Sequence, residues 1–207
     1  MIAAKRNTVI HWFFQRYINH IVKNNFHTVN FNAVEVDEQR SVLLVANHFS
    51  WWDGFILFYL SNRLFKKRFH IMVLEETVRK VSFMKYMGAF SVAKNSKDIV
   101  ASLNYAAELL QDAGNMVVIF PQGKLYSNFV DDVHVEKGVL NILSKAQEKT
   151  QLIFVATFIE HLQYKKPQVN VYLNKQSSNH FANINELKQA YSQHYKFAKQ
   201  QQTQIVI

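Results

Sequence analysis

Short apolar segments rich in β-branched residues alternate with segments of helical periodicity along most of this 207-residue chain. The apolar segments have the length and composition of buried strands. They lie at residues 28–36, 41–46, 69–74, 89–93, 116–120, 152–159 and 169–173. Helical periodicity is found at residues 9–22, from about 50, from 96 or 97 to 113, at 136–149 and at 184–200. This alternation predicts an α/β domain with a mainly parallel or mixed sheet flanked by helices.

The first helical segment is amphipathic. Its apolar residues recur at the i, i+3, i+4 spacing of one helix face, and they are Ile10, Phe13, Phe14, Tyr17, Ile18 and Ile21. Basic and polar side chains fill the other side. Such a helix suits the interfacial plane of a membrane, and it equally suits packing on a domain, so both interpretations stay open. We predict a membrane-associating helix at residues 1–27 and an α/β domain at 28–207.

The net charge is strongly positive, with 24 Lys and Arg against 15 Asp and Glu, which gives +9. A basic excess favours a polyanionic partner, such as nucleic acid, an anionic membrane surface or a phosphorylated substrate. The chain has no RRM sequence and no zinc-finger spacing. We therefore expect an anionic membrane surface as a partner and no nucleic acid.

Several classes of site and location are disfavoured by the sequence. The absence of cysteine excludes disulfides and thiolate nucleophiles, and no paired histidine spacing predicts a metal site. The apolar segments are shorter than the ~20 residues of a membrane span, and the N-terminus lacks a clean signal-peptide pattern. We expect a cytoplasmic protein, peripheral on the inner face of the cell membrane. Its oligomeric state is not set by the sequence.

The segment VANHFSWWDG at 45–54 places His48 five residues before Asp53, directly after the predicted strand 41–46. In open α/β sheets, ligands bind beyond the carboxyl ends of the strands. A neutral imidazole at this place can take a proton from an attacking hydroxyl while a carboxylate holds its tautomer. The alternative is a structural histidine beside an Asp in the first turn of a helix. Asn47 is expected to help shape the turn.

Two further segments end at strand exits. Phe120-Pro121-Gln122-Gly123-Lys124 follows the predicted strand at 116–120, and residues 88–94, GAFSVAK, form a short strand that ends at Lys94. A turn with exposed amides and a lysine can hold an anion or an oxyanion. Because parallel strands end at one edge, all three loops should converge there.

Together these segments resemble the glycerolipid acyltransferase family, the lysophosphatidic acid acyltransferase-like group. NHFSWWD at 47–53 matches its NHx4D block, FPQG at 120–123 is similar to its FPEG block, and GAFSVAK resembles its third block. Residues 136–138 and 152–159 resemble two later blocks, so the resemblance covers roughly residues 40–160 in the expected order.

The resemblance implies a glycerol-3-phosphate acyltransferase-like fold and an acyltransferase. It would move a fatty acyl group from acyl-CoA or acyl carrier protein to a hydroxyl of a lysophospholipid or another lipid-like acceptor. His48 would be the general base and Asp53 its partner. The substrate-binding residues would be Asn47, Lys94, Phe120, Pro121, Gln122, Gly123 and Lys124. No cofactor is implied beyond the thioester co-substrate.

The chain departs from the family in the residues that meet the acceptor. The glutamate of FPEG is Gln122, the usual Thr-Arg-Ser after that block is Lys124-Leu125-Tyr126, and the arginine of the third block is Lys94. Lysine does not reproduce the bidentate geometry with which arginine binds phosphate. A phosphate-bearing acceptor is therefore left open, as are a non-catalytic lipid- or acyl-binding module with the same fold and a hydrolase.

Overall fold

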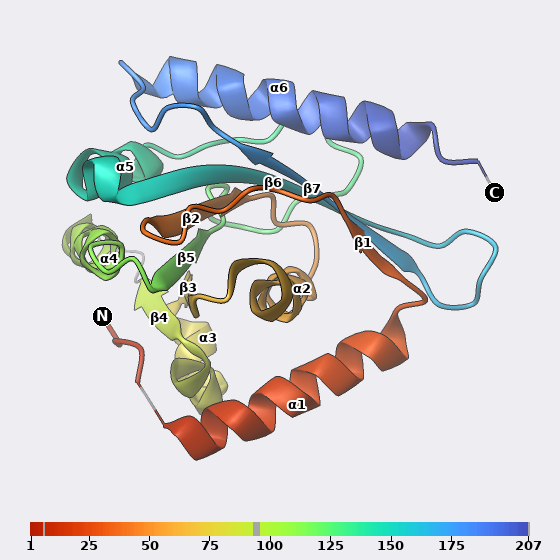
Figure 1. Ribbon diagram of the computed structural model, residues 1–207, viewed down its shortest axis with the longest axis horizontal. Helices are drawn as coiled ribbons and strands as arrows, with labels where there is room; N and C mark the ends of the chain where they lie inside the picture. Colours follow the sequence, from red (N-terminus) through yellow and green to blue (C-terminus); the bar gives the residue numbers. More distant parts are fainter. Residues whose placement is uncertain (6, 93–95, 207) are drawn as a thin grey trace.

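One seven-stranded sheet runs through the computed structural model of the protein, which describes residues 1–5, 7–92 and 96–206 (Figure 1). Its order is β1-β7-β6-β2-β5-β3-β4. The strands are β1 (Val29–Phe31), β2 (Ser41–Ala46), β3 (Arg68–Leu74), β4 (Ala89–Val92), β5 (Asn115–Ile119), β6 (Thr150–Glu160) and β7 (Gln168–Lys175). All neighbouring pairs are parallel except β6 and β7. The predicted mainly parallel or mixed sheet is confirmed.

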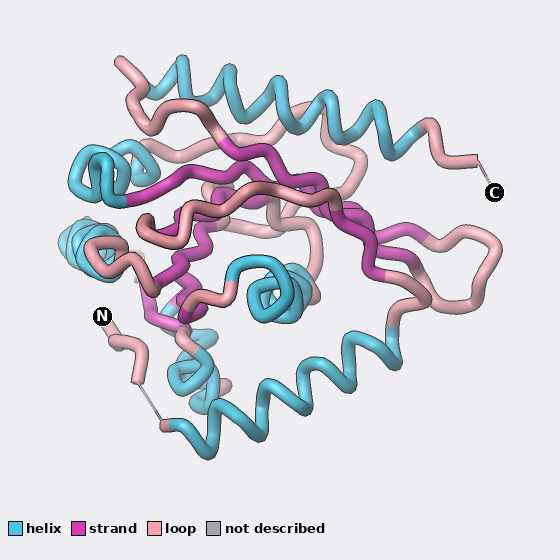
Figure 2. The backbone as a smooth tube through the Cα atoms, viewed as in Figure 1, coloured by secondary structure: helices cyan, strands magenta, loops and turns pink. Residues whose placement is uncertain are grey.

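Helices cover both faces of the sheet (Figure 2). They are α1 (Thr8–Asn25), α2 (Asp53–Leu60), α3 (Glu75–Lys80), α4 (Ser96–Leu109), α5 (Gly138–Ala146) and α6 (Ile184–Thr203). Because successive strand residues point to opposite faces, Leu43 and Val45 of β2 join a buried cluster with α4, α5 and α6. Val42 and Leu44 join a second cluster with α1 and α2. The sheet is thus the shared middle layer of two cores.

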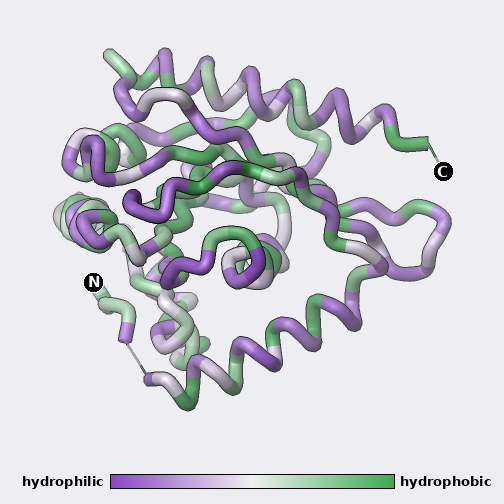
Figure 3. The backbone as a smooth tube through the Cα atoms, viewed as in Figure 1, coloured by the Kyte–Doolittle hydropathy of each residue, from purple (hydrophilic) through white to green (hydrophobic). Residues whose placement is uncertain are grey.

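The amphipathic helix α1 packs on the domain by one side only. Asn7 caps its first turn, and Ile18 and Val22 are buried against α2 and the strands. The outward side carries exposed apolar residues among basic ones, and hydropathy alternates along the whole helix (Figure 3). Its exposed large apolar residues are Val9, Trp12, Phe13 and Tyr17. In the described part of the chain, no helix has the length and apolarity needed to cross a membrane.

The structure corrects some predicted boundaries. The strand predicted at residues 28–36 ends at Phe31, because the Asn32 side chain takes over the pairing. Its Oδ1 accepts from Leu173 N at 2.7 Å, and its Nδ2 donates to Leu173 O at 2.9 Å. The helix predicted to reach residue 113 ends at Leu109, four residues before the position that Gly114 indicated. Between β3 and β4, α3 and the 3₁₀ segment Ser82–Met87 were not predicted.

His194 on α6 is expected to make stability depend on pH. Its ring is buried beside Phe154, its Nε2 donates to Tyr172 O at 3.1 Å, and burial lowers its pKa to about 4. The unfolded chain takes up this proton near pH 6.5, so the free energy of unfolding should fall by about 3 kcal/mol from pH 6.5 to 4 and stay flat above. Urea unfolding of the wild type and of His194→Gln, which cannot charge, isolates this effect. Identical pH dependence in both proteins would contradict it.

Candidate active site

The loop between β2 and α2 is organised around the Asp53 carboxylate. This side chain is almost fully buried, and its Oδ2 accepts from the backbone N–H groups of Phe49 and Ser50, both at 2.8 Å. The same oxygen lies 2.9 Å from His48 Nδ1. Asp53 is the first residue of α2, where a negative charge is favoured by the helix dipole. One oxygen therefore fixes both the backbone of the turn and the imidazole.

The contact with Asp53 sets which nitrogen of His48 is available. An ionised carboxylate only accepts hydrogen bonds, so Nδ1 is the protonated nitrogen and Nε2 keeps its lone pair. The His48 side chain is about one quarter exposed, in contrast to that of Asp53. Its other support is the Phe120 ring, which is stacked at a centroid distance of 4.2 Å and an interplanar angle of 12°. The imidazole is thus held from two sides, by the Asp53 carboxylate and by the Phe120 ring.

The loop after β5 holds the main chain of His48. Gln122 Oε1 accepts from His48 N at 2.5 Å, and Tyr126 N donates to His48 O at 3.0 Å. Pro121 opens a tight turn in which Gly123 N donates to Phe120 O, and Gly123 has a φ of +67°. Glycine adopts this left-handed conformation without strain. The two predicted loops thus converge at the carboxyl ends of the neighbouring strands β2 and β5.

Asn47 joins a third strand to this site. It is fully buried, its Oδ1 accepts from Thr157 N at 2.7 Å, and its Nδ2 donates to Thr157 O at 2.9 Å. These two bonds continue the pairing of β2 with β6 past Ala46, where the backbone ladder ends. Asn47 therefore anchors the start of the loop between β2 and α2 to β6.

The other predicted substrate-binding residues differ in position. Pro121 and Gln122 are buried beneath the turn, whereas Gly123 and Lys124 are exposed on it. Lys124 Nζ lies 5.4 Å from the centre of the Tyr126 ring. Lys94 lies outside the described residues. Sequence reasoning missed Tyr126 and Thr157, because both act through backbone groups and leave no side-chain pattern to recognise.

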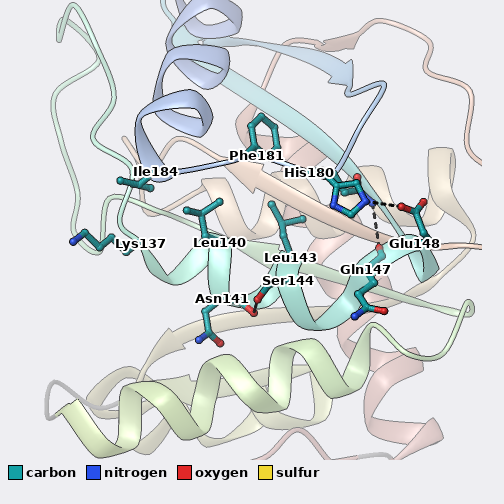
Figure 4. Close-up of a pocket in the computed structure, with 11 residues that line it drawn as sticks. Lys137, Leu140, Asn141, Leu143, Ser144, Gln147, Glu148, His180, Phe181 and Ile184 are labelled. Carbon is teal, nitrogen blue, oxygen red and sulfur yellow. Dashed lines mark hydrogen bonds and ion pairs between the residues drawn. The ribbon is translucent and has the colours of Figure 1, made fainter.

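A separate cleft lies away from His48 and Asp53. It has a volume of 730 Å³ and runs along α5 beneath the segment 179–184 (Figure 4). Leu140, Leu143, Phe181 and Ile184 line it, and His180 Nε2 lies 2.7 Å from Glu148 Oε1 at one end. None of the predicted site residues lines this cleft. Among the described residues, no group of three or more His, Cys, Asp or Glu side chains is placed to hold a metal ion.

Gln122→Ala should weaken both the fold and the site. The substitution removes the acceptor of the His48 N–H, and an unsatisfied backbone donor costs about 1–3 kcal/mol of unfolding free energy. Displacement of the imidazole should lower the turnover rate roughly 10- to 100-fold. Gln122→Glu keeps an acceptor oxygen and is the matched control. Urea unfolding and initial rates test both variants, and an alanine variant as stable and active as the wild type would refute this role.

Comparison with known proteins identifies the family. A sequence profile described as Acyltransferase matches residues 22–160, which include His48, Asp53 and the loop after β5. The chain belongs to this family. This match agrees with the acyltransferase family that the sequence motifs predicted, and an acyl donor is a class of substrate for such a protein. No curated protein matches the chain.

A solved structure shows the same acyltransferase fold. It is the 1-acyl-sn-glycerophosphate (LPA) acyltransferase PlsC from Thermotoga maritima, which superposes with a TM-score of 0.69. The alignment covers 95% of this chain and 83% of that one at 17% sequence identity. The predicted glycerol-3-phosphate acyltransferase-like fold is confirmed, with its N-terminal helix and seven-stranded sheet.

Proposed function

We propose that this acyltransferase moves a fatty acyl group from acyl-CoA or acyl carrier protein to a hydroxyl of a lysophospholipid or another lipid-like acceptor. His48 is the general base and Asp53 is its partner. The observation that carries the proposal is the 2.9 Å contact between His48 Nδ1 and Asp53 Oδ2, which leaves Nε2 as a base at the carboxyl end of the sheet.

The reaction needs no acyl-enzyme intermediate. His48 Nε2 takes the proton of the acceptor hydroxyl as its oxygen attacks the thioester carbonyl carbon. The Asp53 carboxylate stabilises the imidazolium that forms. When the carbon–sulfur bond breaks, the imidazolium returns the proton to the leaving thiolate. The products are an ester and a free thiol, and the histidine is ready for another cycle.

The turn after β5 bears on which acceptor the enzyme uses. Gln122 is neutral, and its Oε1 is occupied by the backbone of His48. The exposed cation on the same turn is Lys124, which offers a point charge without the planar fork of arginine. These residues support a lipid-like acceptor without requiring a phosphomonoester on it.

Thiol release from acyl-CoA and from acyl carrier protein tests this function. Each donor is assayed with lysophosphatidic acid, with lysophospholipids that carry larger headgroups, and with uncharged lipid alcohols. We expect thiol release that depends on an acceptor and matches the ester formed. Release without ester would indicate hydrolysis, and no release with any acceptor would contradict the proposed reaction.

We also propose that the enzyme is peripheral on the inner face of the cell membrane and docks through the outward side of α1. Arg16 lies over the Trp12 ring at 4.3 Å, so a cation and exposed aromatic surface occupy the same side of the helix. This combination suits the interface of an anionic bilayer.

Trp12→Ser combined with Phe13→Ser should weaken binding to anionic vesicles at least several-fold, because both side chains are more than half exposed. Co-sedimentation measures the bound fraction. Deletion of the helix is a poorer test, since it also removes Ile18 and Val22 from the core. Unchanged binding of the folded double variant would argue against docking through α1.

A further inference from the structure

Exposed aromatic side chains surround the catalytic edge of the sheet. The strands β6, β2 and β5 are adjacent and parallel, so they end at the same edge. Each is followed by a loop with an exposed aromatic residue: Tyr164 after β6, Trp51 after β2 and Phe129 after β5. Their exposed fractions are 43%, 66% and 88%. Single exposed apolar residues are ordinary on protein surfaces. Three exposed aromatic residues on the loops after three adjacent strands, at the edge that carries His48, are a pattern that calls for a function.

The hairpin of β6 and β7 extends beyond the end of β2. Val155 pairs with Ala46, the last residue of β2, whereas β6 continues to Glu160. At about 3.3 Å per residue, the turn 161–167 stands roughly 16 Å beyond the end of β2. Figure 1 shows this hairpin beside the C-terminal end of α1. His27, which follows α1, holds the helix end and the hairpin together. Its backbone N–H donates to Pro167 O at 2.9 Å, and its ring is stacked on the Tyr164 ring at a centroid distance of 3.6 Å.

The same hairpin carries unneutralised positive charge. Lys165 and Lys166 are both exposed, and neither is ion-paired with any residue in the described ranges. Three carboxylates also lie on this side: Asp131 pairs with Lys199 Nζ at 3.0 Å, whereas Asp132 and Glu160 accept only from neutral donors, Ser192 Oγ at 2.9 Å and Gln202 Nε2 at 2.7 Å. None of them is ion-paired with Lys165 or Lys166, so the hairpin offers an anionic partner free cations next to aromatic surface.

We propose that the catalytic edge itself lies on the anionic bilayer. Trp51, Phe129 and Tyr164 enter the interface, and Lys165 and Lys166 bind lipid headgroups. The inference rests on the proposed association with a membrane and adds its orientation, with His48 facing the lipid. An acceptor then reaches the base directly from the bilayer. An acidic carrier protein would also attract the lysines, but aromatic side chains spread over three separate loops fit a broad lipid surface better.

Charge reversal on the hairpin tests the orientation. Lys165→Glu with Lys166→Glu should reduce binding of the full chain to phosphatidylcholine vesicles with about one quarter phosphatidylglycerol by tenfold or more. The matched control is Lys149→Glu with Lys175→Glu. It makes the same change in net charge on exposed residues at the opposite end of β6 and β7. The control should lose less than about threefold, since bulk charge acts weakly over a Debye length. An equal loss in both variants would overturn the proposal.

Aromatic substitutions test whether Phe129 and Tyr164 insert into the bilayer interface. Phe129→Ser with Tyr164→Ser should reduce vesicle binding about tenfold or more, because each loses apolar surface from the interface. Phe129→Trp with Tyr164→Trp should keep binding, since tryptophan favours the same interface, and its emission should shift further to the blue on vesicles than the emission of the wild type, which already contains three tryptophans. Unchanged binding of the serine variant, or a shift in the tryptophan variant no larger than that of the wild type, would overturn insertion at this edge.

A further assay separates this proposal from the catalytic one. With a short-chain acceptor below its critical micelle concentration, the hairpin and serine variants should transfer acyl groups at the wild-type rate. Their rates should fall only with acceptor embedded in anionic vesicles. A wild type that binds vesicles through this edge but transfers no acyl group would defeat the proposed reaction alone. Normal vesicle binding by all variants, with impaired binding to acyl carrier protein, would assign the edge to the carrier protein instead.

Discussion

His48→Ala should reduce acyl transfer by roughly 10²–10⁴-fold, the usual contribution of a positioned general base. The substitution removes Nε2, and no other imidazole among the described residues contacts Asp53. The fold should survive, because the His48 ring is partly exposed and its main chain keeps the bonds from Gln122 and Tyr126. Initial rates of thiol release with saturating donor measure the effect, and circular dichroism with urea unfolding checks the fold.

A second histidine–carboxylate pair provides the control for this experiment. His180 Nε2 lies 2.7 Å from Glu148 Oε1, but both side chains are largely exposed and lie at the α5 cleft. His180→Ala therefore removes a similar contact without touching the catalytic loop, and it should leave the rate within about twofold, as expected for a surface pair. Full activity of His48→Ala, or an equal loss in His180→Ala, would refute the assignment of His48 as the base.

The sequence was informative about where the site lies because strand ends are local features. The run at 41–46 predicted β2, and His48 follows it by two residues, so the loop that carries His48 could be placed at the carboxyl edge of the sheet. The same reasoning placed Gln122 after β5. Parallel neighbours then bring the two loops together, and this is what the bond from His48 N to Gln122 Oε1 shows.

The detailed geometry could not be predicted, because it depends on backbone groups and distant partners. On a straight helix, residues five apart point about 140° away from each other, given ~100° per residue. The structure avoids this problem because α2 begins only at Asp53, and the preceding turn curls His48 back to the carboxylate. The N–H groups of Phe49 and Ser50 drive that turn, and neither leaves a side-chain signature.

Long-range pairing by side-chain amides was equally hidden. Asn32 ends β1 by bonding to Leu173, and Asn47 extends β2 by bonding to Thr157. Each partner is more than 100 residues away along the chain, so local periodicity contains no trace of it. Asn47 was expected to shape its own turn, and the structure instead shows it bound across to β6.

Asp53→Asn should lower the turnover rate roughly 10²–10⁴-fold while the protein stays folded. The side-chain oxygen of asparagine can still accept from Phe49 N, Ser50 N and His48 Nδ1, so the turn can keep its shape. What disappears is the negative charge that stabilises the imidazolium as the acceptor hydroxyl is deprotonated. The measurement is the rate of thiol release together with the free energy of unfolding, and the expected result is a large loss in the first with a small loss in the second.

Asp53→Ala provides the comparison that separates positioning from charge. Alanine leaves the Phe49 and Ser50 N–H groups without an acceptor at about 1–3 kcal/mol each, so this variant should be both inactive and markedly less stable. If Asp53 served only to close the first turn of α2, the asparagine variant would retain the wild-type rate and only the alanine variant would be impaired. A slow but stable asparagine variant beside an unstable alanine variant requires the carboxylate to act in the chemistry as well as in the turn.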